Sequence, residues 1–175
     1  HFGHQDHSIG GMEIRSVTPG YFELMGIPVR RGRAFTERDT GSSAPVAIVS
    51  ENVVRRWWPA SESLGDRVII GRFGDRDYRI NDSPREVIGV LPERFRFLDR
   101  RVSLVVPYQL DRSKTFLGQF SFNAVARLKP GATYEQAQAD VARLIPISFT
   151  LFPPFAGMNV KMFEDAITTE RILSL

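Results

Sequence analysis

The chain has 175 residues, 42% of them hydrophobic, which is enough for at least one buried core because a domain of this size hides about two thirds of its unfolded surface. Its 23 Lys and Arg residues face 20 Asp and Glu residues, for a net charge of +3. The absence of Cys excludes disulfides and thiolate metal sites, and the longest apolar run, 144–155, is interrupted by prolines and is about half as long as a membrane helix of roughly 20 residues.

The N-terminal region predicts a loose tail followed by a strand and a short helix. Residues 1–12 are rich in His and Gly and are expected to be a flexible tail, whereas residues 13–17 alternate in polarity as a strand does. Thr18 is then expected to cap a helix over residues 21–25, and Gly26 to end it. A second extended segment, residues 27–35, completes a strand, helix, strand order.

The next unit is a buried strand followed by an amphipathic helix. Residues 45–50 form a continuous apolar run of strand length, which predicts a strand covered on both faces. Ser50 is placed to cap the helix that follows, and Pro59 to end it. The apolar residues of this helix recur at spacings of three and four, as expected for one buried face; they are Val53, Val54, Trp57 and Trp58.

This helix also supplies the one candidate surface for a ligand or a protein partner. Trp57 and Trp58 could stack on a ligand, and Arg55 and Arg56 point to the opposite side of the helix. We refer to these four residues as the Trp–Arg surface. The alternative is that the two indoles anchor the core, since each buries on the order of 200 Å².

Four further strands are predicted downstream. Residues 67–70 and 85–91 are expected to pair as antiparallel neighbours, and residues 102–107 to form a strand that ends at Pro107. Residues 122–128 alternate again and predict another strand.

The clearest helix begins at Thr133, which with Gln136 has the spacing of a capping box. Its expected apolar stripe consists of Tyr134, Ala137, Val141, Leu144 and Ile145. Residues 159–163 then predict a returning strand, so that the C-terminal part repeats the strand, helix, strand order.

The sequence predicts no catalytic, cofactor-binding or metal site. There is no phosphate-binding loop, and all three His residues lie in the tail, away from a structured site. Glu37 with Asp39, and Glu164 with Asp165, could be written as acid and base, but each pair lies in a polar stretch where nothing would separate the two pKa values. We therefore expect a chain that is not an enzyme.

Nucleic acid is not an expected partner either. The basic residues are almost all Arg and are spread along the chain beside Asp or Glu, a pattern that GC-rich coding also produces. Phe95 and Phe97 alternate with Arg94 and Arg96, which could serve base stacking, but the same alternation is typical of a half-buried strand.

Five sequence blocks, in this order, resemble the MacB-type periplasmic core domain of ABC transporter permeases, in the acidobacterial-type branch of the FtsX/MacB-like family. They are RSVTPGYFELMGIPVRRGRAFTERD, APVAIVSENVVRRWWPASESLGDRV, REVIGVL, LVVPYQL and FNAVARLKPGATYEQAQADVARL. The resemblance covers roughly residues 13–175.

The resemblance implies an α+β fold with two lobes. A porter-like lobe would combine residues 13–39 with residues 120–165, and a mostly β, sabre-like lobe, residues 40–119, would be inserted between them. Residues 166–175 resemble the approach to a transmembrane helix. The chain departs from the pattern at Pro146, where relatives usually continue a longer helix and this one is expected to end.

The resemblance also implies a function. The domain would be a non-catalytic part of a permease on the extracytoplasmic, periplasmic side of the bacterial cytoplasmic membrane, transmitting conformational change in efflux. Its implied partners are its own transmembrane helices, a cytoplasmic ABC ATPase, a second permease copy and a periplasmic adaptor. The alternative is a periplasmic ligand- or protein-binding module without a transport role.

Overall fold

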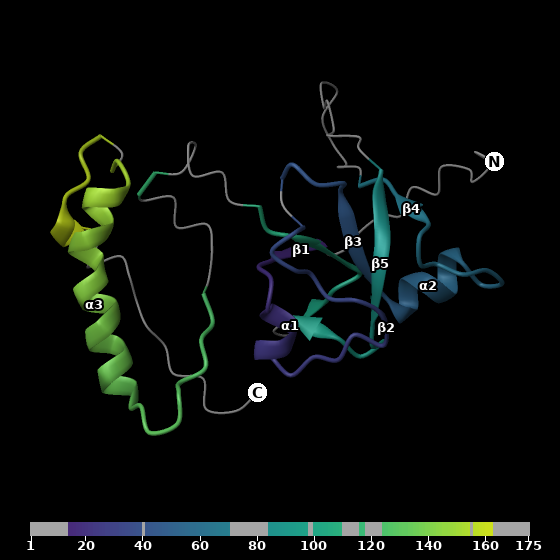
Figure 1. Ribbon diagram of the computed structural model, residues 1–175, viewed down its shortest axis with the longest axis horizontal. Coiled ribbons are helices and arrows are strands. Elements are labelled where there is room, and N and C mark those ends of the chain that lie inside the picture. Colours follow the sequence, from purple (N-terminus) through teal and green to yellow (C-terminus); the bar gives the residue numbers. More distant parts are fainter. Residues whose placement is uncertain are drawn as a thin grey trace. The chain divides into compact units, whose positions relative to one another are not determined.

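A computed structural model of the chain describes residues 14–39, 41–70, 84–97, 100–109, 116–117, 124–154 and 156–162. These residues belong to two compact units, His1–Gln109 and Leu110–Leu175, which are described separately below. Figure 1 shows strands and helices in the first unit and a long helix, α3, in the second. The expected mixed α+β fold is confirmed.

The first unit is built around a mixed sheet whose centre is β3, the apolar run predicted as a buried strand. The order of strands is β1-β8-β3-β5-β2, and β4 also pairs with β5. All five residues of β3 are buried, as expected for a strand covered on both faces. The strands are β1 (Ile14–Val17), β2 (Arg31–Gly32), β3 (Val46–Ser50), β4 (Arg67–Val68), β5 (Arg85–Leu91) and β8 (Leu104–Pro107). A separate hairpin joins β6 (Arg96–Phe97) and β7 (Arg100–Arg101).

Helix α2 (Glu51–Trp57) connects two parallel neighbours in this sheet, β3 and β5. Parallel strands need such a crossover because the chain must return to the same end of the sheet. β4 pairs with β5 in the antiparallel sense, which confirms the predicted pairing of residues 67–70 with 85–91. Ser50 precedes α2 as expected, but its side chain makes no capping hydrogen bond.

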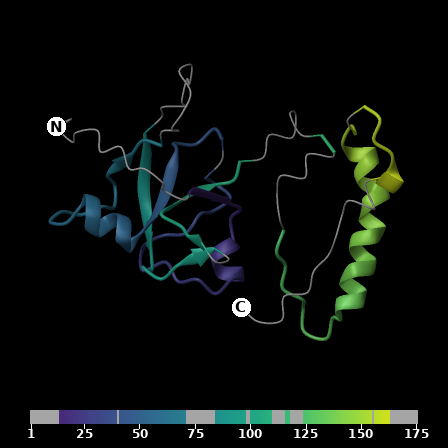
Figure 2. The same ribbon diagram turned by 180° about the vertical axis from the view of Figure 1, so that it is seen from behind.

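The sheet has a hydrophobic core on each face. Ile48 contributes to the core on the α1 side, together with Phe22 and Val105, whereas its neighbours Ala47 and Val49 contribute to the core on the α2 side. This alternation follows from the period of two along a strand. Accordingly, α1 and α2 lie on opposite sides of the sheet in both views (Figures 1 and 2).

Helix α1 (Tyr21–Leu24) is shorter than predicted and begins differently. Gly20, with a φ of 82°, holds the N-cap position, so the expected side-chain cap by Thr18 is wrong. Thr18 instead accepts a backbone hydrogen bond from Tyr21 through its carbonyl oxygen. Gly26 follows the helix with a φ of 66°, as expected for a glycine that ends a helix.

The N-terminal strands share one sheet with later segments. β1 pairs with β8, and β2 pairs with β5. The boundary predicted between residues 39 and 40 therefore falls inside this sheet. The pairing of residues 13–39 with residues 120–165 in one lobe stays a prediction.

The second unit contains helix α3 (Tyr134–Leu151), and its predicted start is confirmed. The Thr133 hydroxyl accepts a hydrogen bond from the Gln136 amide, and the Gln136 side chain accepts one from the Thr133 amide. The prediction that Pro146 ends the helix is wrong. Proline in a helix removes one backbone hydrogen bond at a cost of about 3 kcal/mol, which disfavours the helix without forbidding it.

The apolar stripe of α3 is largely exposed in this unit. Of the predicted stripe only Ile145 is buried, while Val141 and Leu144 are 38% and 52% exposed. Ile147 and Leu151, which extend the stripe beyond Pro146, are also exposed.

Two predicted strands of the second unit are wrong where the structure describes them. Residues 124–128 form no strand, because an alternating pattern gives a strand only where another strand pairs with it. Residues 160–162 are helical, and the Asn159 side chain accepts a hydrogen bond from the Met162 amide as helix-capping residues do. Residues 122–123 and 163 lie outside the described residues.

Candidate functional site

The Trp–Arg surface predicted from the sequence is only partly a surface. Trp58 is buried, at 8% exposure, and belongs to the core on the α2 side of the sheet. Its indole N–H donates a hydrogen bond to the Asp66 carboxylate. Trp58 is therefore a core anchor, as buried indoles with a satisfied N–H usually are.

The other three residues of the Trp–Arg surface remain accessible to different degrees. Trp57 is half-buried beside the same core, with its ring centroid 5.8 Å from that of Trp58. Arg56 is exposed. Arg55 already pairs with the Glu93 carboxylate and donates to Asn52 at 2.9 Å. The part of this surface that is open to a partner is thus Arg56, together with the half-buried Trp57.

Helix α2 is tied to the turn that follows β5. The backbone N–H of Glu93 donates to the Glu51 carboxylate at 3.1 Å, and the side-chain amide of Asn52 donates to the backbone carbonyl of Glu93 at 3.3 Å. Together with the Arg55–Glu93 pair, these contacts hold α2 against the turn.

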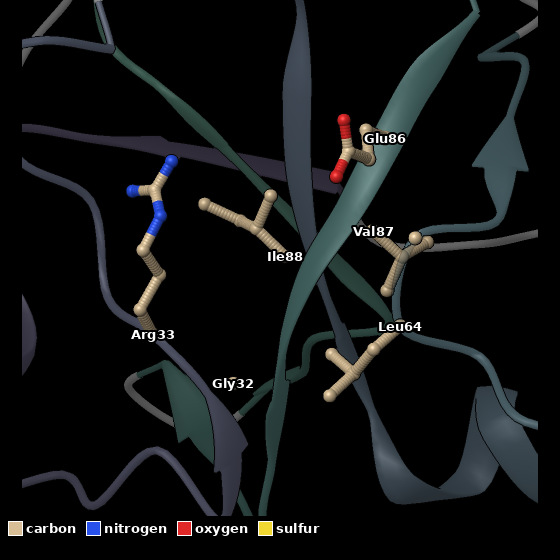
Figure 3. A pocket seen from close by; sticks show the side chains of 7 residues that line it. Gly32, Arg33, Leu64, Glu86, Val87 and Ile88 are labelled. Carbon is tan, nitrogen blue, oxygen red and sulfur yellow. The ribbon is translucent and has the colours of Figure 1, made fainter.

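A groove lies along the edge of β5 that faces away from β3, and we call it the β5 groove. It was not predicted from the sequence. β2 pairs with residues 89–90 and β4 with residues 85–86, so two short strands approach β5 from different ends. The hollow has a volume of about 370 Å³ and is lined by Gly32, Arg33, Leu64, Gly65, Glu86, Val87 and Ile88. In Figure 3, Ile88 points towards Arg33, and Val87 and Leu64 lie on the other side of β5.

Gly32 determines how closely β2 approaches β5. Its φ is +74°, and a Cβ atom built there would lie 2.1 Å from the Ile88 carbonyl oxygen. Gly65, which also lines the groove, has a similar φ of +81°, but a Cβ atom there would meet nothing within 4 Å. A glycine inside a predicted strand is a known sign of a close backbone approach, so Gly32 within residues 27–35 carried a usable signal.

One lining residue of the groove, Arg33, forms an ion pair with the buried carboxylate of Asp39. The two terminal guanidinium nitrogens of Arg33, Nη1 and Nη2, each donate to one Asp39 carboxylate oxygen, at 2.8 and 2.9 Å. The Thr36 amide and hydroxyl add hydrogen bonds to the same carboxylate at 2.7 and 3.2 Å. The Asp39 side chain is 5% exposed, whereas that of Arg33 is 49% exposed. The buried Asp39 carboxylate therefore stabilises the turn at residues 36–39 through its bonds to Arg33 and Thr36.

These contacts shift the pKa values of both partners. The hydrogen bonds from Arg33, followed by those from Thr36, hold the pKa of Asp39 below its usual value, although burial opposes them. The Asp39 carboxylate in turn raises the pKa of Arg33. Both groups are consequently charged at neutral pH, and neither is poised to exchange a proton.

We predict that Asp39→Asn lowers the free energy of unfolding by about 1–2 kcal/mol at pH 7, the range for hydrogen bonds to a charged group after allowance for the exposed Arg33. Since the folded-state pKa is depressed, the contribution of Asp39 is present above its unfolded value near 3.8 and is lost as the pH falls through the folded value. Urea unfolding at pH 7 and at pH 3 should therefore show that acidification lowers the free energy of unfolding less in Asp39→Asn than in the native chain.

The matched control is Glu37→Gln, which removes an exposed carboxylate from the same turn. We expect this variant to lose little free energy of unfolding at pH 7, since the side chain is exposed. Equal losses in the two variants would mean that Asp39 contributes no more than a surface charge.

The acidic residues that the sequence analysis considered form neither a metal site nor an acid and base pair where the structure describes them. No three His, Asp or Glu side chains among them gather at metal-binding distance. Glu37 is exposed and Asp39 is occupied by Arg33, so they do not form an acid and base pair. Glu164 and Asp165 lie outside the described residues. Within the described part of the chain, no helix is both long and apolar enough to span a membrane.

The sequence matches the MacB-like periplasmic core domain family over residues 2–144, well over half of the chain. The chain therefore belongs to this family.

Two curated relatives illustrate the relationship. The probable export ATP-binding/permease protein MacB of Pseudomonas entomophila is 26% identical over 77% of this chain and 19% of its own length. The uncharacterized ABC transporter permease YknZ of Bacillus subtilis is 24% identical over 88% of this chain and 36% of its own length. The chain thus spans about a fifth to a third of these relatives.

Solved structures of related domains also match the chain. The periplasmic region of MacB from Actinobacillus actinomycetemcomitans aligns with a TM-score of 0.49 at 21% identity, covering 88% of this chain and 65% of that chain. The extracellular domain of YknZ from Gram-positive bacteria aligns with a TM-score of 0.37 at 26% identity, covering 53% of this chain and 41% of that chain.

Proposed function

We propose that this chain is the non-catalytic extracytoplasmic domain of an ABC transporter permease, on the periplasmic side of the membrane. The observation that carries the proposal is the family match over residues 2–144. Relatives whose names describe export ATP-binding/permease proteins support it, although the chain corresponds to only part of their length.

The proposed role is to transmit conformational change between the membrane and partner subunits during export. A stiff body suits that role, because a close-packed interior transmits displacement with little compression. The supporting feature is the sheet with a core on both faces, in which Ile48, Val87 and Val105 are fully buried.

The proposed partners are the permease's own transmembrane helices, a cytoplasmic ABC ATPase, a second permease copy and a periplasmic adaptor. Within the Trp–Arg surface, Arg56 and Trp57 are the proposed contact residues, since Arg and Trp are enriched at the energetic centres of protein interfaces.

The division into a porter-like lobe, residues 13–39 with 120–165, and a sabre-like lobe, residues 40–119, stays part of the proposal, with the two lobes sharing the sheet in which β1 pairs with β8 and β2 with β5. The tail, residues 1–12, and the approach to a transmembrane helix, residues 166–175, complete it.

The alternative is a periplasmic ligand- or protein-binding module without a role in transport. The β5 groove is the place that such a module would use, but it is a wide-open hollow and does not enclose a ligand as most binding pockets do.

One experiment separates the two proposals. In the full-length permease, residues 14–162 are replaced by a short Gly/Ser linker, and cells are tested against a panel of macrolides and other antibiotics. We expect the replacement to abolish the protection that the intact transporter provides, while the ATPase subunit in isolated membranes still hydrolyses ATP. A transporter with an ATPase subunit that cannot hydrolyse ATP is the control for lost transport. Protection equal to that of the intact transporter would favour the binding module.

A further inference from the structure

We draw no further inference here: the strongest candidate, the exposed apolar stripe of helix α3 that includes Val141, Leu144, Ile147 and Leu151, carries none because nothing in the described part of the chain shows what covers it.

Discussion

Gly32→Ala is expected to lower the free energy of unfolding of the isolated domain by about 2–5 kcal/mol. A φ of +74° costs a residue with a side chain roughly 1–2 kcal/mol, and although Gly32 is exposed, relieving the collision of a new methyl group with a neighbouring strand costs about 1–3 kcal/mol more, as overpacking does. The added methyl group would lie 2.1 Å from the Ile88 carbonyl oxygen, which is backbone and cannot swing away. The loss should appear as a lower urea midpoint with an unchanged slope.

Gly65→Ala is the matched control, because it carries the same backbone penalty without the collision. Its φ is +81°, and the new Cβ atom would meet nothing within 4 Å. We expect this variant to lose only about 1–2 kcal/mol. If the two variants lost the same free energy, the close approach of β2 to β5 at Gly32 would be wrong.

Trp58→Ala is expected to cost about 3–5 kcal/mol, the usual loss when a large aromatic side chain is removed from a core. The indole is 8% exposed and donates its N–H to Asp66, so truncation leaves both a cavity and a carboxylate without that donor. Chemical denaturation of the isolated domain measures the loss.

Trp57→Ala removes the adjacent indole, which is only half-buried. It should cost about 1–2 kcal/mol, because less buried apolar surface is lost than at Trp58. In the full-length transporter it also tests the proposed partner contact. Loss of antibiotic protection in a variant that remains folded would support that contact. If Trp57→Ala destabilised the domain as much as Trp58→Ala, both indoles would be core residues and Trp57 would have no surface role.

Sequence reasoning located the elements whose signals are local. The apolar run of β3 and the three-and-four spacing in α2 depend on residues next to one another, and so does the capping box at Thr133. For Trp58 the structure favours the alternative interpretation, a core anchor, over the predicted ligand or partner surface.

The errors had two causes, one in distant residues and one in local helix geometry. Residues 124–128 alternate as a strand does, but forming a strand depends on a partner that the sequence does not name. At Pro146 the local rule predicted the end of α3, yet the helix continues to Leu151. The hydroxyls of Ser148 and Thr150 donate to the carbonyls of Ile145 and Ile147, an arrangement that no simple proline rule includes.

The β5 groove was missed for the same reason. Its lining residues come from three segments that lie far apart in sequence, and Asp39, the partner of Arg33, was considered only together with Glu37. Gly32, a glycine within a strand pattern, was a signal of this close approach that the sequence reasoning did not use.

The central claim, that this domain lies on the extracytoplasmic side of the membrane, is tested most directly by cysteine labelling. Since the chain has no Cys, a single Ser61→Cys substitution in an otherwise Cys-free full-length permease provides one exposed thiol. Ser63→Cys, two residues away and 0% exposed, is the buried control, which should react only after denaturation. We predict that a membrane-impermeant maleimide labels Ser61→Cys in intact spheroplasts, and labelling that appears only after the spheroplasts are lysed would contradict the account.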